Sequence, residues 1–232
     1  MTDLDWNNVE KRTNELALLF LKTSEKLKER NPNYSKIDAR LTIFVKCHHV
    51  MNSIHLSAVF MRECGIKKEW WSKLTDISKN QTVIDETLLE HNKTLRFSLA
   101  MFLPSMIESS LRDFVRKMDP SACNNGRGDF KNIYSWLMPR LTLNDNQYEE
   151  LLDLIRIYRN GPHTNWIYLP RTPGNKIITY KDEQFLFEDG KKIKSRTWDF
   201  YLDKIQDLHD MILEMVETEE ISNFDNIPTA GY

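Results

Sequence analysis

Long stretches without helix-breaking residues dominate this chain of 232 residues, which contains only 7 Gly and 8 Pro. Apolar side chains recur at steps of three and four residues within 5–30, 35–64, 85–118 and 195–217. Residues three or four apart share one face of a helix, so this spacing predicts amphipathic helices. Pro104 lies inside the third stretch and is expected to kink or divide it. The predicted fold class is therefore mainly α, a bundle of long helices.

The pattern changes period near residues 176–193. Two short runs, 177–180 and 184–187, are rich in β-branched and aromatic residues, and each is followed by turn-forming residues. Such runs predict a small β-hairpin, or a three-stranded flap if Lys192 and Ile193 also pair.

The order of these elements predicts three parts. Residues 1–75 form an N-terminal helical extension packed on the core, and residues 80–220 form a helical domain. The end of the chain is acidic and then polar, with Pro228 and Gly231. Residues 221–232 are therefore expected to form a flexible tail.

Composition narrows the class of protein. Lys and Arg number 32 against 34 Asp and Glu, a formal net charge of −2, so no whole-molecule field attracts polyanions. Three cysteines without a Cys-x-x-Cys pair indicate neither a disulfide framework nor a zinc site. Asp3 and Asp5 stand where a signal peptide is basic, and no apolar run approaches the roughly 18 residues of a spanning helix. We expect a cytoplasmic protein without a membrane partner and, since no phosphate-binding loop or dinucleotide fingerprint occurs, without a cofactor.

Two histidines, His48 and His55, raise a metal-binding hypothesis because they lie two helical turns apart. Side chains seven residues apart do not easily reach one ion, and both lie on an apolar stripe. We therefore expect histidines that pack and form hydrogen bonds, and no metal site.

The segment from Leu154 to Pro170 carries the densest group of chemically useful side chains. Arg159, Asn160 and His163 lie at a helix end and in the turn that leaves it, where side chains can reach a ligand. A guanidinium can hold a phosphate or stabilise a phosphorane, and an imidazole exchanges protons near neutral pH. RNA supplies its own nucleophile in the 2′-hydroxyl, so such a group suits metal-free cleavage of a phosphodiester.

This segment resembles the HEPN superfamily of helical proteins, many of which are metal-independent endoribonucleases. The family signature is an Arg followed by a polar residue and, four to six positions after the Arg, a His. Here Arg159-Asn160-Gly161-Pro162-His163 is similar to a shortened Arg-Asn-x-x-His variant that precedes an Asn and an aromatic-Pro segment. Three residues separate Arg159 from His163, whereas six separate Arg156 from the same His. The resemblance in element order covers residues 95–217.

The resemblance implies a HEPN-like helical bundle that forms a homodimer, in which two copies of the motif meet in one RNA-cleaving cleft. Arg159 would stabilise phosphorane charge, His163 would act as base or acid on the 2′-hydroxyl, and Asn160 would orient the pair. The family also implies a toxin or antiviral defence effector, with an antitoxin or another protein as partner. Substrate-binding or supporting roles would fall to Arg156, Asn165, Trp166, Tyr168, Glu108 and Arg112.

A purely structural interpretation of the same residues stays open. Arg159 could pair with Glu150 or Asp153 on its own helix, Asn160 could cap that helix, and His163 could hydrogen-bond a loop carbonyl. The chain would then be a non-catalytic helical module that binds a protein or a nucleotide.

Two further patterns bear on this segment. Residues 127–176 contain seven basic against five acidic residues, a mild bias that permits RNA binding without predicting it. Glu108 and Arg112 are four residues apart on one predicted helix, which is the spacing of an intrahelical ion pair.

Overall fold

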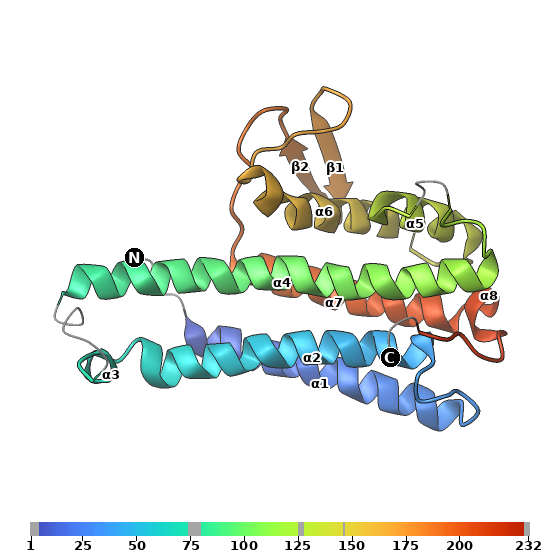
Figure 1. The fold of residues 1–232 in the computed structure, drawn as a ribbon, viewed down its shortest axis with the longest axis horizontal. Coiled ribbons are helices and arrows are strands. Elements are labelled where there is room, and N and C mark those ends of the chain that lie inside the picture. Colours follow the sequence, from blue (N-terminus) through green and yellow to red (C-terminus); the bar gives the residue numbers. More distant parts are fainter. Residues whose placement is uncertain (1–4, 74–79, 125–127, 146, 230–232) are drawn as a thin grey trace.

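The fold is mainly α with one two-stranded antiparallel sheet, as the sequence predicts. The structure is a computed structural model that describes residues 5–73, 80–124, 128–145 and 147–229. Long helices lie side by side along the long axis of the molecule (Figure 1). They are α1 (Trp6–Arg30), α2 (Ala39–Phe60), α4 (Gln81–Met118) and α7 (Trp198–Glu217).

Neighbouring long helices bury their apolar faces against each other. α1 packs along α2, α2 packs along α4, and α7 contacts both α1 and α4. One continuous core results, to which these four helices contribute Phe20, Phe44, Leu103 and Leu208 respectively. Beyond α2, a π-helical turn (Met61–Gly65) leads to the short α3 (Lys68–Trp71). The two N-terminal helices thus lie directly on the rest of the bundle.

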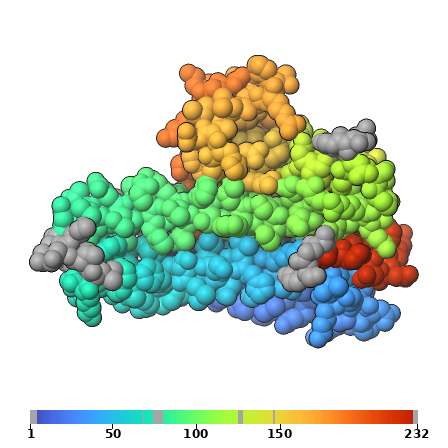
Figure 2. Space-filling view, in the orientation of Figure 1, coloured from blue at the N-terminus to red at the C-terminus, as the bar shows by residue number. Residues whose placement is uncertain are grey.

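A smaller layer stands on α4 (Figures 1 and 2). Both of its helices contact α4, and the hairpin packs on the second of them. Its elements are α5 (Phe130–Leu137), a 3₁₀ turn (Met138–Arg140), α6 (Tyr148–Asn160), a second 3₁₀ turn (Gly161–Thr164), β1 (Lys176–Tyr180) and β2 (Glu183–Phe187). The chain then enters α7, and α8 (Glu219–Ser222) follows it.

Side-chain caps fix where several helices begin. In five helices, the side chain of the residue just before the helix accepts a hydrogen bond from a backbone N–H of the first turn. The caps are Asp5, Asp38, Asn80, Asp129 and Thr197. α4 begins at Gln81, four residues earlier than its apolar spacing predicts. The side chain of Asn80 accepts a hydrogen bond from the backbone N–H of Thr82, and the spacing of apolar residues contains no information on such a cap.

Pro104 does not divide α4, although the sequence predicts that it kinks or divides the helix. The helix continues from Gln81 to Met118 with Pro104 buried inside it. A proline removes one backbone donor, and the hydroxyl of the next residue, Ser105, donates to the carbonyl oxygen of Met101 at 2.7 Å. Buried apolar residues on either side hold this part of α4 against the core. Tertiary packing therefore outweighs the local cost of the proline.

The predicted β-hairpin is present as two strands. Alternate side chains of β1 and β2 enter the core, namely Ile178, Tyr180, Phe185 and Phe187. A two-residue turn at Lys181 and Asp182, with φ values of 46° and 62°, closes the hairpin. Lys192 forms an isolated bridge to Ile167 rather than a third strand.

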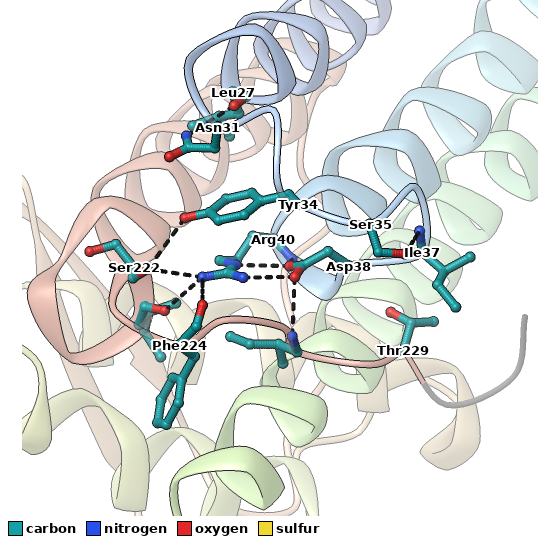
Figure 3. Close-up of polar contacts among 12 residues, drawn as sticks. Leu27, Asn31, Tyr34, Ser35, Ile37, Asp38, Arg40, Ser222, Phe224 and Thr229 are labelled. Carbon is teal, nitrogen blue, oxygen red and sulfur yellow. Dashed lines mark hydrogen bonds and ion pairs between the residues drawn. The ribbon is translucent and has the colours of Figure 1, made fainter.

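Residues 221–229 do not form the flexible tail that the sequence suggests. Arg40, fully buried at the start of α2, donates hydrogen bonds to the carbonyl oxygens of residues 221, 222 and 224 at 2.8–3.2 Å (Figure 3). Asp38 accepts hydrogen bonds from Arg40 and from the backbone N–H of Ile227. Residues 221–227 lie more than 180 positions after Asp38 and Arg40, so the local composition of the tail does not reveal these contacts. The remaining tail residues, 230–232, lie outside the described part of the chain.

The two histidines of the metal hypothesis hydrogen-bond the backbone of α1. The Nδ1 atom of His48 lies 2.9 Å from the carbonyl oxygen of Ala17, and that of His55 lies 3.2 Å from the carbonyl oxygen of Glu10. Among the described residues, no group of three or more His, Cys, Asp or Glu side chains is placed to hold a metal ion. Within the same residues, no helix has both the length and the apolar run that crossing a membrane requires.

Candidate functional site

A cavity of about 710 Å³ opens where α4, the start of α5, the end of α6 and the segment before β1 meet. Its volume lies within the range of small-molecule sites. Residues from all four of these parts of the chain line it. Six of the residues singled out in the sequence are among them, namely Glu108, Arg156, Arg159, Asn160, His163 and Tyr168.

A tight turn after α6 brings the motif to the cavity wall. The 3₁₀ turn at Gly161–Thr164 is followed by two residues in the left-handed region, Asn165 and Trp166, with φ values of 52° and 62°. The indole of Trp166 folds back onto Gly161, where an added Cβ would lie 2.6 Å from a ring carbon. The backbone N–H of Trp166 also donates to the carbonyl oxygen of Gly161 at 2.6 Å. Glycine is therefore required at this position of the motif.

Arg159 is fixed by contacts outside its own helix. One of its terminal nitrogens lies 2.6 Å from a carboxylate oxygen of Glu108 on α4, and both side chains are largely buried. The guanidinium carbon also lies 5.6 Å from the centre of the Phe130 ring. The open interpretation in which Arg159 pairs with Glu150 or Asp153 is therefore wrong.

Glu108 is shared between two arginines. Its other carboxylate oxygen accepts a hydrogen bond from Arg112 at 2.8 Å, which confirms the intrahelical pair that the spacing predicts. One carboxylate thus contacts two guanidinium groups, those of Arg112 and Arg159, and leaves this centre with one positive charge.

Asp153 organises a second charged centre on the cavity wall. It accepts hydrogen bonds from Tyr134 of α5, from Arg156 one turn later on α6, and from Lys176 of β1. Burial raises the pKa of Asp153, but the hydrogen bonds from these groups outweigh it and lower that pKa to about 2. Burial and the hydrogen bond to Asp153 raise the pKa of Tyr134. The carboxylate therefore stays ionised at neutral pH and holds three elements together.

Asn160 and His163 are exposed on the cavity wall. Within the described residues, neither side chain forms a hydrogen bond to another protein group, so the loop carbonyl expected in the structural interpretation is not a partner of His163. Both side chains are accordingly available to a ligand.

Three predicted supporting residues lie outside the cavity lining. Trp166 packs on Gly161, and Asn165 is exposed in the left-handed turn beside it. Arg112 lies behind Glu108, with a terminal nitrogen close to Gly128. Their positions fit support of the motif turn and of Glu108 rather than direct contact with a ligand in the cavity.

Several lining residues were not among the predicted site residues. They are Asp129, Phe130, Lys131, Asn132, Ile157, Gly161, Thr164, Ile167, Leu169, Pro170, Arg171, Thr172, Lys176 and Ile193. The surplus of basic residues in 127–176 is the sequence signal that indicates Lys131, Arg171 and Lys176. The Asp153 centre gave no such signal, because Lys176 lies on a different element, 23 residues along the chain.

The charges around the cavity favour an anionic ligand. Six basic side chains (Arg112, Lys131, Arg156, Arg159, Arg171 and Lys176) lie on or directly behind its wall. Three carboxylates oppose them, those of Glu108, Asp129 and Asp153. The local balance of +3 contrasts with −2 for the whole chain, so positive charge is concentrated at this cavity.

Comparison with protein-family models, with curated proteins and with solved structures finds no match to this chain. The resemblance to HEPN proteins therefore depends on the motif and on the order of elements around it.

Proposed function

We propose that this chain is a HEPN-like, metal-independent endoribonuclease that cleaves RNA through the 2′-hydroxyl. One observation carries the proposal: Arg159, Asn160 and His163 line a single cavity whose surroundings carry a surplus of positive charge. A cationic cavity attracts the phosphate backbone of a nucleic acid. The guanidinium of Arg159 and the unpaired imidazole of His163 line the same cavity, and they are the two groups that transphosphorylation needs.

The proposed reaction is an internal transfer of the phosphoryl group. His163 takes the proton of the 2′-hydroxyl as the oxygen attacks the neighbouring phosphorus, and Arg159 stabilises the charge of the phosphorane. The bond from phosphorus to the 5′-oxygen then breaks, and that oxygen takes a proton from an imidazolium, either that of the same His163 or that of the second His163 in a homodimer. The products are a 2′,3′-cyclic phosphate and a free 5′-hydroxyl. Asn160, the last residue of α6, orients Arg159 and His163.

A homodimer is part of this proposal. The reaction needs two proton transfers, and each protomer contributes only His163 to them. A two-fold axis beside the cavity would place His163 of a second protomer in the same cleft. By family resemblance alone, we further propose a cytoplasmic toxin or antiviral defence effector that an antitoxin or another protein controls.

Purified protein incubated with RNA in EDTA tests the proposed function. We expect cleavage that leaves 2′,3′-cyclic phosphate ends. His163→Ala should abolish it with an unchanged melting temperature, because the exposed ring adds little to the core. His49→Ala is the matched control, since His49 is an exposed histidine on α2. Products with 5′-phosphate ends, or cleavage that requires a metal, would rule out this mechanism. Binding of RNA or a nucleotide without any cleavage would favour the non-catalytic module.

A further inference from the structure

Two carboxylates at the cavity are each shared by two cations. Glu108 contacts Arg112 and Arg159, and Asp153 contacts Arg156 and Lys176. A carboxylate cancels only one positive charge, so each centre keeps a net charge of +1. The cavity therefore contains two separate fixed positive centres rather than one diffuse positive surface.

The two centres are held apart along α6. The guanidinium of Arg156 is turned back to Asp153, three residues earlier on the helix, at 2.8 Å. That of Arg159 is turned to Glu108 on α4. His163 follows one turn after Arg159, so Arg156 and His163 lie about 10 Å apart along the axis. The backbone positions that carry His163 and the Asp153 centre are therefore separate along the helix.

The Asp153 centre is open to the cavity through its cations. Arg156 and Lys176 both line the cavity. The side chain of Lys176 is 29% exposed and that of Arg156 is 21% exposed, whereas Asp153 is 14% exposed beneath them. A ligand in the cavity therefore meets the cations of this centre before it meets the carboxylate.

We infer that Arg156 and Lys176, held by Asp153, form a second phosphate subsite that binds the phosphodiester next to the one being cleaved. The inference rests on the proposed function, and it makes the substrate class a single strand of RNA with at least two consecutive phosphodiesters. A single strand is required because its backbone can turn to place the 2′-oxygen in line with the leaving oxygen. The Asp153 centre binds and does not take part in the chemical step.

Short substrates separate the two sites. A dinucleoside monophosphate has only the scissile phosphate, and trinucleotides extended by one unit on the 5′ or the 3′ side carry a second phosphodiester. Lys176→Gln should lower kcat/KM about tenfold for one of the two trinucleotides, the cost of one charged contact. It should leave the dinucleoside monophosphate unchanged. Lys176→Arg keeps the charge and should restore cleavage of the trinucleotide.

Lys181→Gln is the matched control. Lys181 lies on the same hairpin as Lys176 and, like Lys176, shares a carboxylate with another cation. That carboxylate is Asp207, and the other cation is Lys204. Lys181 does not line this cavity. We expect this variant to cleave all three substrates as the wild type does.

Binding of 2′-O-methyl RNA tests the second phosphate subsite independently of whether the protein cleaves RNA. This RNA cannot be cleaved, so its affinity reports binding without the chemical step, and the difference between wild type and Lys176→Gln reports the subsite. Lys176→Gln should weaken binding and reduce the slope of log affinity against log salt by about 0.7, the value for one contact to a single strand. A normal slope and normal cleavage of both trinucleotides by Lys176→Gln would overturn the subsite, even if His163→Ala is inactive. A wild type that never cleaves, with a salt dependence of binding that Lys176→Gln reduces by about 0.7, would support the subsite and refute the ribonuclease.

Discussion

Arg159 of α6 and Glu108 of α4 are in contact at 2.6 Å, although they are 51 positions apart in the sequence. This ion pair fixes the guanidinium of the motif from the opposite wall of the cavity. The same carboxylate contacts Arg112, so the position of Arg159 depends on a centre of three charged groups.

Glu108→Gln should separate binding from catalysis. The variant removes a negative charge from the cavity, so binding of uncleavable RNA should be retained or become tighter. Cleavage should fall about 10-fold to 100-fold, because Arg159 loses the group that orients it. Glu90→Gln, at an exposed glutamate on the same helix, is the control. Equal losses of binding and cleavage would contradict a positioning role.

Gly161→Ala should destabilise the protein by about 1–3 kcal/mol, because the new Cβ would overlap the ring of Trp166. The free energy of unfolding in urea measures the effect. In a Trp166→Leu background the same substitution should cost less, since the ring is absent. Equal costs in both backgrounds would show that the overlap is not the cause.

Asp153 should make stability depend on pH in the acid range. Burial raises its pKa, but hydrogen bonds from Lys176, Tyr134 and Arg156 outweigh this and lower it from 3.8 to about 2. A group with a depressed pKa stabilises the fold above its ordinary pKa, and that contribution is lost as pH falls through its pKa in the folded state. The stability gap between wild type and Asp153→Asn should be about 1–2 kcal/mol at neutral pH and should shrink between about pH 4 and pH 2. Urea unfolding at several pH values measures it, and a constant gap would contradict the assignment.

Arg40→Met should cost about 3–5 kcal/mol, because it leaves Asp38 charged and unpaired in the interior. Hydrogen exchange should increase at residues 221–229, whose carbonyls lose their donor. The double variant Asp38→Asn/Arg40→Met should lose less than the sum of its two single variants. Arg30→Met is the control, since its ion pair with Glu217 is exposed and should change stability by less than about 1 kcal/mol.

Light scattering after size exclusion should report a homodimer at micromolar concentration. A cysteine introduced at Asn165, which is exposed beside the motif turn, should form a cross-link between two protomers. A stable monomer would remove the second His163 from the proposed mechanism. A dimer without that cross-link would place the two motifs apart.

The sequence predicts those parts of the structure that local patterns encode. The spacing of apolar residues locates the long helices, and the runs at 177–180 and 184–187 locate the hairpin. The effect of Pro104 is not local, because the packing of α4 against the core keeps the helix undivided.

The candidate site is predictable only in part, for the same reason. Arg159, Asn160 and His163 are close in sequence, so their common location on one cavity follows from the motif. The partners of the two carboxylate centres come from other elements, and pairing between distant charged residues has no pattern in a single sequence. The residues that hold the site together, Glu108 and Asp153, could therefore be identified only from their contacts.

The buried contact between Arg40 and the carbonyls of residues 221–224 also has a consequence for biosynthesis. During translation, Asp38 and Arg40 leave the ribosome long before the segment that completes their environment. Until residues 221–229 are made, this guanidinium lies against the carboxylate of Asp38 and the ring of Tyr34, and water takes the place of the missing carbonyl oxygens. Closure of this end of the bundle therefore waits until residues 221–229 have been synthesised, and a nascent chain that stops before residue 221 exposes an open polar gap there. A product truncated before residue 221 should thus be recognised by quality-control proteases, even though every long helix has been synthesised.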